Sequence, residues 1–202
     1  LKGELMWYLG VGSIRQLPES SKDLIADLAR CLSKSGFSLR TGGRGEVDDA
    51  FWHGADGGIR QMILPIRHFR QYESMISPEI ISYHKLPNDI QSAAIRECAL
   101  PASRRKYHSK LKRAMDDVCV PLVMGENMKA PVRFAITYAP GPLHTPESIN
   151  EIGVSDDPIY ITPDAAAFYL LKKMRIPVFN LTNEEHVSRI VNYINTSKKT
   201  AV

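Results

Sequence analysis

Short apolar runs alternate with glycine-rich turns and helical patterns over the first 65 residues, and this alternation limits the possible folds more than any other feature. Met6 to Val11 is a continuous apolar run, which is typical of a strand buried on both faces. In the next segment, one apolar helical stripe is formed by Leu24, Leu28 and Leu32, which recur every four residues beside Ile25 and Ala29, and Gly36 follows. A strand followed by an amphipathic helix is therefore predicted.

The same alternation then repeats. Residues 37–40 predict a second strand, which leads into the glycine loop 41–45; residues 47–55 predict a short helix, and residues 62–64 a third strand. Strands separated by helices in this order are typical of a parallel sheet with right-handed crossovers. The fold class predicted is α/β, with a mostly parallel sheet and helices on both of its faces.

The rest of the chain is predicted to complete one domain over residues 1–195, followed by a flexible tail at 196–202. Residues 66–90 show little periodicity and are expected to form a long loop. The other expected elements are helices at 90–100 and 102–118, strands at 132–138, 159–161 and 178–181, an exposed loop at 143–158, and helices at 162–173 and from Asn183 onward.

Composition narrows the classes of partner. Hydrophobic residues make up 44% of the chain, enough for a substantial core, and the formal net charge is +4. That charge permits a nucleic-acid partner without requiring one. No apolar run approaches the ~20 residues of a membrane span, so no membrane partner is expected. The first residues do not resemble a signal peptide, which makes the cytoplasm the expected compartment.

Cysteine and histidine spacing favours neither a disulfide framework nor a metal site. Cys31, Cys98 and Cys119 are far apart and form no C-x-x-C pair, so all three are expected to be buried thiols. The six histidines show no metal-ligand spacing. Neither a metal nor another cofactor is expected.

Three segments follow predicted strands and lead into predicted helices: residues 10–15, 41–48 and 139–164. Because the carboxyl ends of parallel strands share one edge of a sheet, these segments should converge there, where ligands of open α/β sheets bind. Trp7, Tyr8, Phe51 and Trp52 are expected to belong to the core and not to the pocket.

The loop from Thr41 to Asp48 is the strongest candidate for binding an anion. Its glycines expose main-chain N–H groups at the start of a helix, where phosphate is favoured. Arg44 and Arg15 could add charged contacts, and Asp48 could accept a hydrogen bond from a ribose hydroxyl. The alternative is that the glycines form only a tight turn and that Asp48 and Asp164 only complement helix dipoles.

A basic stretch offers a second candidate surface. It is either a solvated helix face or a contact for a polyanion, and it consists of Arg104, Arg105, Lys106, Lys110, Lys112 and Arg113.

The motifs G-x-G-x-x-G, G-x-x-x-x-G-K-[ST] and G-x-S-x-G are all missing from the chain. A nicotinamide dehydrogenase, a P-loop nucleotidase and a hydrolase with a nucleophile elbow are therefore not supported.

The glycine loops resemble those of a known superfamily. The segments that carry the resemblance are 8–15 with Pro18, 39–51 with Gly54 and Ala55, 63–65, 124–127, 130–138 and 176–181. Together they resemble the SLOG superfamily, and within it the small DprA-like proteins common in bacteriophage genomes. The resemblance spans nearly the whole chain, and its most specific part is the loop that begins at Thr41.

The resemblance implies a Rossmann-like fold whose loops bind a nucleotide, a nucleotide-derived signal or the phosphates of single-stranded DNA. The implied pocket residues are Gly12, Ser13, Gly42, Gly43, Gly45 and Asp48. Thr162 and Asp164 stand where relatives have a Gly-Gly-Thr run, and Ile14 makes the first loop one residue longer. Family members often self-associate, so a homo-oligomer is also implied.

Three functions remain open at this point. The first is binding of a nucleotide or nucleotide-derived small molecule, as a sensor or sequestering protein; for it the resemblance implies a bacteriophage source and the cytoplasm of a bacterial or infected host cell. The second is DprA-like binding of single-stranded DNA. The third is hydrolysis of a nucleotide N-glycosidic bond, which is weakened because the phosphoribohydrolase motif Pro-Gly-Gly-x-Gly-Thr-x-x-Glu is missing.

Overall fold

A computed structural model describes residues 5–12, 16–67, 69–70, 72, 77–97, 109–139 and 164–199. Within these ranges the strands form one six-stranded parallel sheet in the order β4-β3-β2-β1-β5-β6. Its strands are β1 (Met6–Val11), β2 (Phe37–Thr41), β3 (Arg60–Leu64), β4 (Ile80–Ser82), β5 (Phe134–Thr137) and β6 (Val178–Asn180).

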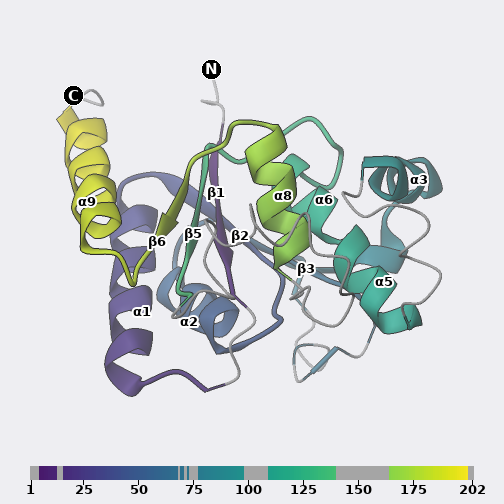
Figure 1. The fold of residues 1–202 in the computed structure, drawn as a ribbon, viewed down its shortest axis with the longest axis horizontal. Coiled ribbons are helices and arrows are strands. Elements are labelled where there is room, and N and C mark those ends of the chain that lie inside the picture. The colour runs from purple at the N-terminus through teal and green to yellow at the C-terminus, as the bar shows by residue number, and fades with distance from the viewer. Residues whose placement is uncertain are drawn as a thin grey trace, which may run out of the picture.

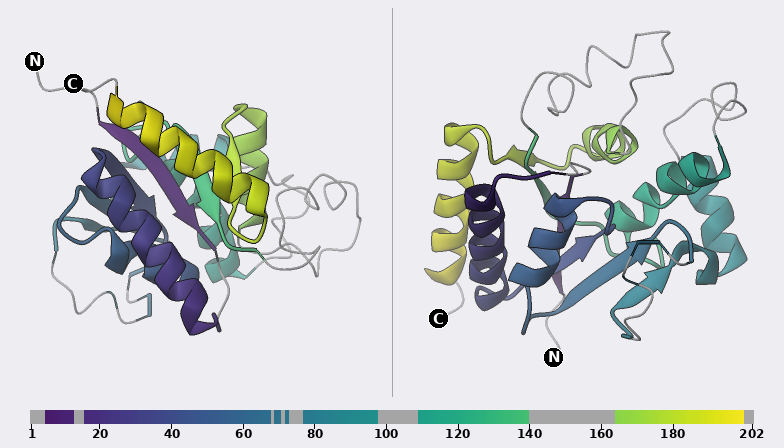
Figure 2. Two further views of the ribbon diagram at one scale, coloured as in Figure 1. Left: turned by 90° about the vertical axis from the view of Figure 1, so that its left-hand side faces the viewer. Right: turned by 90° about the horizontal axis from the view of Figure 1, so that it is seen from below.

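Helices cover both faces of this sheet (Figures 1 and 2). One face carries α1 (Glu19–Lys34), α2 (Glu46–Gly54) and α9 (Glu184–Lys199). The other carries α3 (Asn88–Glu97), α5 (Lys110–Asp117), α6 (Cys119–Met124) and α8 (Ala165–Lys173). The predicted α/β class, with a Rossmann-like arrangement in a single unit, is confirmed.

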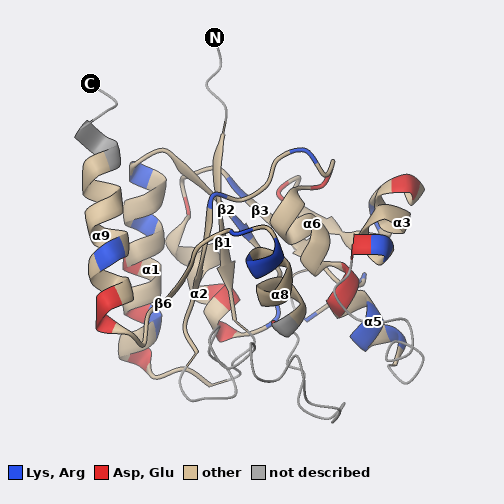
Figure 3. Ribbon diagram, turned by 45° about the horizontal axis from the view of Figure 1, so that its top comes forward, with Lys and Arg blue, Asp and Glu red and all other residues tan. Residues whose placement is uncertain are grey.

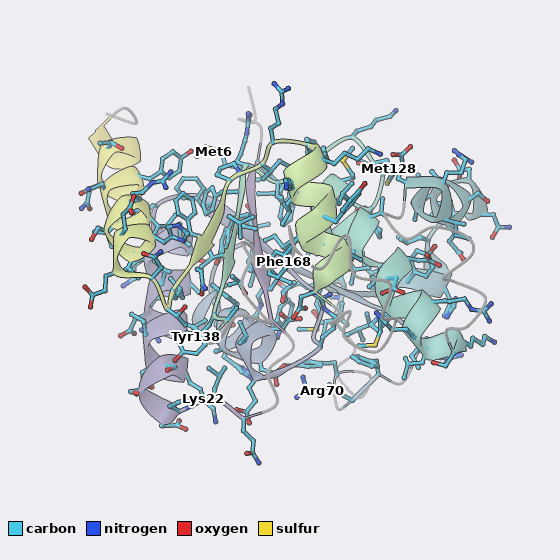
Figure 4. The ribbon with its side chains drawn as sticks, viewed as in Figure 1. Met6, Lys22, Arg70, Met128, Tyr138 and Phe168 are labelled. Atoms are coloured by element: carbon cyan, nitrogen blue, oxygen red, sulfur yellow. The ribbon has the colours of Figure 1, made fainter. Side chains whose placement is uncertain are left out.

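The strand order places a topological switch point between β1 and β5. From β1 the chain adds β2, β3 and β4 outward on one side, and β5 and β6 then pair on the other side of β1. At such a point the connections on the two sides diverge and leave a crevice beyond the carboxyl ends of the strands. In Figure 4, Lys22, Arg70 and Tyr138 lie toward the carboxyl edge, and Met6 and Met128 lie toward the amino edge.

Each face of the sheet has its own apolar core. On the α1 side, Tyr8 stacks on Phe134 with ring centroids 5.7 Å apart. On the α8 side, Leu9 packs in a cluster with Leu122 and Phe168. Successive residues of a strand point to opposite faces, so a continuous apolar strand such as β1 supplies both cores.

The predicted apolar stripe of α1 packs on the core except at one edge. Its buried positions include Ile25, Ala29 and Leu32, whereas Leu24 lies at the edge with 42% of its surface exposed. Cys31, on the same helix, is exposed, so the expectation of buried thiols is wrong there. It holds for Cys119, which is buried; Cys98 lies outside the described residues.

Several short elements were not predicted. β4 and the 3₁₀ turn Tyr83–Lys85 lie within the expected loop 66–90, and α6 lies beyond the predicted end of the preceding helix. Three residues are too few for strand alternation to be recognised, and Pro121 inside α6 reads as a helix breaker. α9 extends to Lys199, so a helix covers residues 196–199 of the expected tail. The expected strand 159–161 and loop 143–158 lie outside the described residues.

Among the described residues, no helix has both the length and the apolar composition needed to cross a lipid bilayer.

Candidate functional site

Two of the predicted loops meet at the carboxyl edge, where one carboxylate joins them. Asp48 lies in the first turn of α2. Its Oδ1 accepts a hydrogen bond from the main-chain N–H of Gly12 at 2.7 Å, and its Oδ2 accepts one from the main-chain N–H of Arg44 at 2.9 Å. The end of β1 is thereby tied to the loop after β2, as the convergence of strand ends predicted.

The Arg44 side chain extends this cluster to α8. Its Nε lies 3.5 Å from Asp48 Oδ2, and its Nη2 lies 3.3 Å from Oδ1 of Asp164, the residue that precedes α8. Its Nη1 is 3.5 Å from the Cys119 sulfur. The side chains of Arg44 and Asp48 are fully buried, and that of Asp164 is 9% exposed. One buried cation thus joins the loop after β2, α2, α6 and α8.

Burial perturbs the protonation equilibria of this cluster. Burial raises the pKa of Asp48 to about 6; nearby Asp164 adds to the rise, while Arg44 opposes it. Burial lowers the pKa of Arg44, but the attraction of Asp164 and Asp48 outweighs it and leaves that pKa above its usual value. Arg44 therefore stays charged, and Asp48 is the member of the pair whose charge changes in mildly acidic solution.

The glycines of the second loop pack against the protein's own side chains. Residues 41–45 are all buried. A Cβ on Gly42 would lie 2.8 Å from Arg44 Nε, and a Cβ on Gly43 would lie 2.9 Å from the Met62 sulfur. Gly43 also has φ +63°, a left-handed conformation that favours glycine. Close packing and backbone geometry account for both glycines, and the Arg44 side chain occupies the space beside Gly42.

The segment after β3 contributes side chains that the sequence analysis did not identify. Arg70 donates a hydrogen bond to the Gly43 carbonyl oxygen at 3.1 Å and two to the Asp49 carboxylate at 2.9 and 2.7 Å. The Tyr72 hydroxyl also donates to Asp49. The residues of this segment show no helical or strand periodicity, so the sequence did not indicate that the segment contacts the glycine loop. Figure 4 shows Arg70 at this edge.

The other predicted ligand residues fall into two groups. Thr41 is fully buried, and its hydroxyl has no hydrogen-bond partner among the described residues. Gly12 and Gly45 are also buried, at the end of β1 and before α2. Ser13, Arg15 and Thr162 lie outside the described residues. The cluster therefore contains Gly12, Arg44, Asp48 and Asp164, and the other residues of the loop 41–45 are buried as well.

Only part of the basic stretch can be placed. Lys110 and Arg113 are exposed on α5, and Lys112 pairs with Asp116 at 2.7 Å. Figure 3 shows both basic and acidic positions along the ribbon of this helix. Arg104, Arg105 and Lys106 lie outside the described residues. The helix that carries the described part of the stretch thus bears both signs of charge.

A cavity of about 640 Å³ lies at the opposite, amino edge of the sheet. Trp7 and Arg40 belong to its wall. Tyr8, Phe51 and Trp52 are buried as expected, but Trp7 is only half-buried and lines this cavity. Arg40 lies inside the predicted strand 37–40, and a charged residue within a buried strand was a signal that its side chain reaches something polar.

Among the described residues, no group of three or more histidine, cysteine or carboxylate side chains is arranged to hold a metal ion. Comparison of the chain with protein-family models, with curated proteins and with solved structures finds no match.

Proposed function

We propose that this protein binds a nucleotide or a nucleotide-derived small molecule at the carboxyl edge of its sheet, beside the switch point between β1 and β5. The observation that carries the proposal is the buried cluster of Arg44, Asp48 and Asp164. Burying ion pairs contributes little to stability compared with apolar packing. Perturbed carboxylates in such clusters occur preferentially at functional sites.

The cluster would act by holding the binding loops in place before a ligand arrives. Asp48 fixes the main-chain N–H groups of Gly12 and Arg44, and Arg44 fixes the residue that precedes α8. Two helices, α2 and α8, begin at this edge, and their amino ends favour negative charge. Such fixed dipoles bind an anion without the free-energy cost of ordering a flexible loop.

Roles within the site differ from those suggested by the sequence. Because Arg44 already faces two carboxylates, it is a positioning residue in this proposal and not a direct phosphate contact. Because Gly42 and Gly43 are packed, the phosphates would bind closer to Gly12 and to the amino end of α8. Both oxygens of Asp48 accept main-chain hydrogen bonds, which favours holding a ligand over general-base chemistry.

Thermal stabilisation by nucleotides tests the proposal. Adenine and guanine nucleoside mono-, di- and triphosphates would each be added at 1 mM (about 100 times a Kd of 10 µM), where a bound ligand adds about 2.7 kcal/mol to stability. Asp164→Asn should weaken the response several-fold, because it removes a charge that orients Arg44. Asp27→Asn, at an exposed carboxylate that pairs with Arg30, is the matched control.

Two results would count against the proposal. One is no stabilisation by any nucleotide, and the other is an Asp164→Asn response equal to that of the unmodified protein. Binding of a single-stranded oligonucleotide that falls steeply with salt and is lost in Lys110→Glu with Arg113→Glu would support DNA binding instead. A free base released during incubation, detected by chromatography, would support hydrolysis.

A further inference from the structure

The cavity at the amino edge lies at the other end of the strands from the proposed nucleotide site. In Figure 1, this edge of the sheet, where β1 begins, is at the top of the view. Its wall is formed by the start of β1, the loop 125–133 that precedes β5 and the turn 174–177 that precedes β6, together with Arg40 of β2 and Gln61 of β3. Its volume, about 640 Å³, falls in the range of small-molecule sites.

Arg40 is a buried cation in this wall without a carboxylate in ion-pair contact among the described residues. It is 2% exposed. Its Nε donates to Gln61 Oε1 at 3.0 Å, and its Nη1 donates to the carbonyl oxygens of Ala130 at 3.1 Å and Leu122 at 3.4 Å. For Nη2, the described residues offer no hydrogen-bond acceptor. All its direct partners are therefore neutral.

A buried charge with only neutral partners is unusual, because desolvation is normally compensated by an opposite charge. Burial lowers the pKa of Arg40 to about 10, and the charge of Glu126 opposes this effect from a distance. The guanidinium therefore remains charged at neutral pH, at a cavity wall and with one nitrogen free to donate a hydrogen bond.

The surroundings of Arg40 define what kind of anion fits. Its guanidinium lies over the Trp7 ring, 4.4 Å from the ring centroid. Gly125, at φ +88°, lets the loop approach, since a Cβ there would be 3.3 Å from Nη2. Arg133 and Arg175 also line the cavity, against one carboxylate, that of Glu126. The lining is thus net positive beside an aromatic ring.

The geometry points to a second binding site, at the amino edge, for a small organic oxyanion. The ligand would carry a phosphate or carboxylate that meets Arg40, attached to a ring or another apolar body that contacts Trp7. Leu5, Ile176 and Pro177 add apolar surface to the wall, which suits such a body. A guanidinium offers the paired donors that both kinds of oxyanion accept.

Nuclear magnetic resonance of the two indole N–H groups tests this site directly. The chain has two tryptophans; Trp7 lines the cavity, and Trp52, a residue of α2, is buried in the core on the other face of the sheet. Phenyl phosphate and benzoate, as the phosphate and carboxylate probes, should shift the Trp7 signal and leave the Trp52 signal in place. Phenol, the neutral ring, should bind at least tenfold more weakly. Trp52→Phe assigns the two signals.

Three variants then separate a charge effect from a folding effect. Arg40→Met should weaken binding of the preferred oxyanion about tenfold or more, the effect of losing a charged hydrogen bond. Arg175→Asn removes a rim charge where φ is +57°, a conformation that asparagine tolerates, and should weaken binding about threefold, as expected for a more exposed charge. Arg30→Glu, at an exposed residue of α1, should change nothing.

The proposal is overturned if neither oxyanion shifts the Trp7 signal, if phenol binds as tightly as the oxyanions, or if Arg30→Glu weakens binding as much as Arg175→Asn. If the Arg40→Met variant does not fold, the Arg175→Asn variant and the comparison with phenol decide whether the proposed site exists. The test is independent of the carboxyl-edge proposal, because Asp164→Asn should leave phenyl phosphate binding unchanged and Arg175→Asn should leave nucleotide binding unchanged.

Discussion

Asp48 Oδ1 accepts a hydrogen bond from the main-chain N–H of Gly12 at 2.7 Å, although the two residues are 36 positions apart in the chain. This contact connects the residue that follows β1 with the first turn of α2. Gly12 has no room for a larger residue, since a Cβ there would lie 2.7 Å from the Val47 side chain. The carboxylate therefore fixes a backbone approach that only glycine permits.

The first prediction concerns Asp48 and pH. Its pKa is raised in the folded protein to about 6 from 3.8, so between these values the folded state binds more protons than the unfolded state. This residue's contribution to the free energy of unfolding should therefore be largest below about pH 4 and should fall as pH rises to 6. The change is about 3 kcal/mol, from about 1.4 kcal/mol per pKa unit.

Asp48→Asn should remove that pH dependence. Urea unfolding at several pH values from 4 to 7 would measure the free energy of unfolding of both proteins. The difference between the unmodified protein and the variant should shrink as pH rises toward 6. A constant difference over this range would contradict the assignment of the raised pKa to Asp48.

The second prediction concerns Arg44. Arg44→Met removes a buried cation that faces two carboxylates, and should lower the free energy of unfolding by about 3 to 5 kcal/mol, because buried charges are left uncompensated. Arg30→Met removes an exposed partner of Asp27 and should change stability by less than about 1 kcal/mol. Chemical denaturation of both variants checks this, and similar effects of the two changes would contradict it.

The third prediction concerns the contact between α1 and α2. A Cβ on Gly54 would lie 2.3 Å from the main-chain oxygen of Ala26, so Gly54→Ala must push the helices apart and should cost more than about 2 kcal/mol. Gly36→Ala is the matched control: its φ is +84°, with nothing within 4 Å of the added carbon, and strain alone should cost about 1 kcal/mol. Melting temperatures should follow the same order, and a reversed order would contradict the close approach.

The fourth prediction concerns thiol reactivity. Cys31 is exposed, and Cys119 is buried, with its sulfur beside Arg44 and the Met115 carbonyl oxygen. In a Cys98→Ser background, one thiol per chain should react rapidly with a maleimide in native buffer and two should react in denaturant. Mass spectrometry counts the adducts, and rapid double labelling of the native protein would contradict the burial of Cys119.

Local patterns predicted the frame of the molecule well. The bounds of β1 match the apolar run 6–11, and β2, α2 and β5 lie within one or two residues of their predicted positions. These elements carry their own signal, since burial on both faces requires a continuous apolar run and a turn after it requires glycine. β4 carries no such signal, because an edge strand of three residues is recognised only through its pairing with β3.

The candidate sites were predictable only in outline. The rule that strand ends share an edge predicted that Gly12, Arg44, Asp48 and Asp164 would gather, and the structure brings them together. It did not predict that Arg44 would turn inward and fill the space beside Gly42. The conformation of a long side chain such as that of Arg44 depends on which carboxylates from distant parts of the chain lie near it. The local sequence does not contain that information.

Residue order alone specifies the parallel α/β frame, because apolar periodicity, glycine and helix-start signals act over a few neighbouring residues. The partners of Arg40, Arg44 and Asp48 arise only when crossovers bring together segments separated by tens of residues, where burial makes an unpaired charge costly. The tertiary structure therefore determines which partners the buried charges have, and it forms the cavity beside Trp7. Both proposed sites depend on those charges.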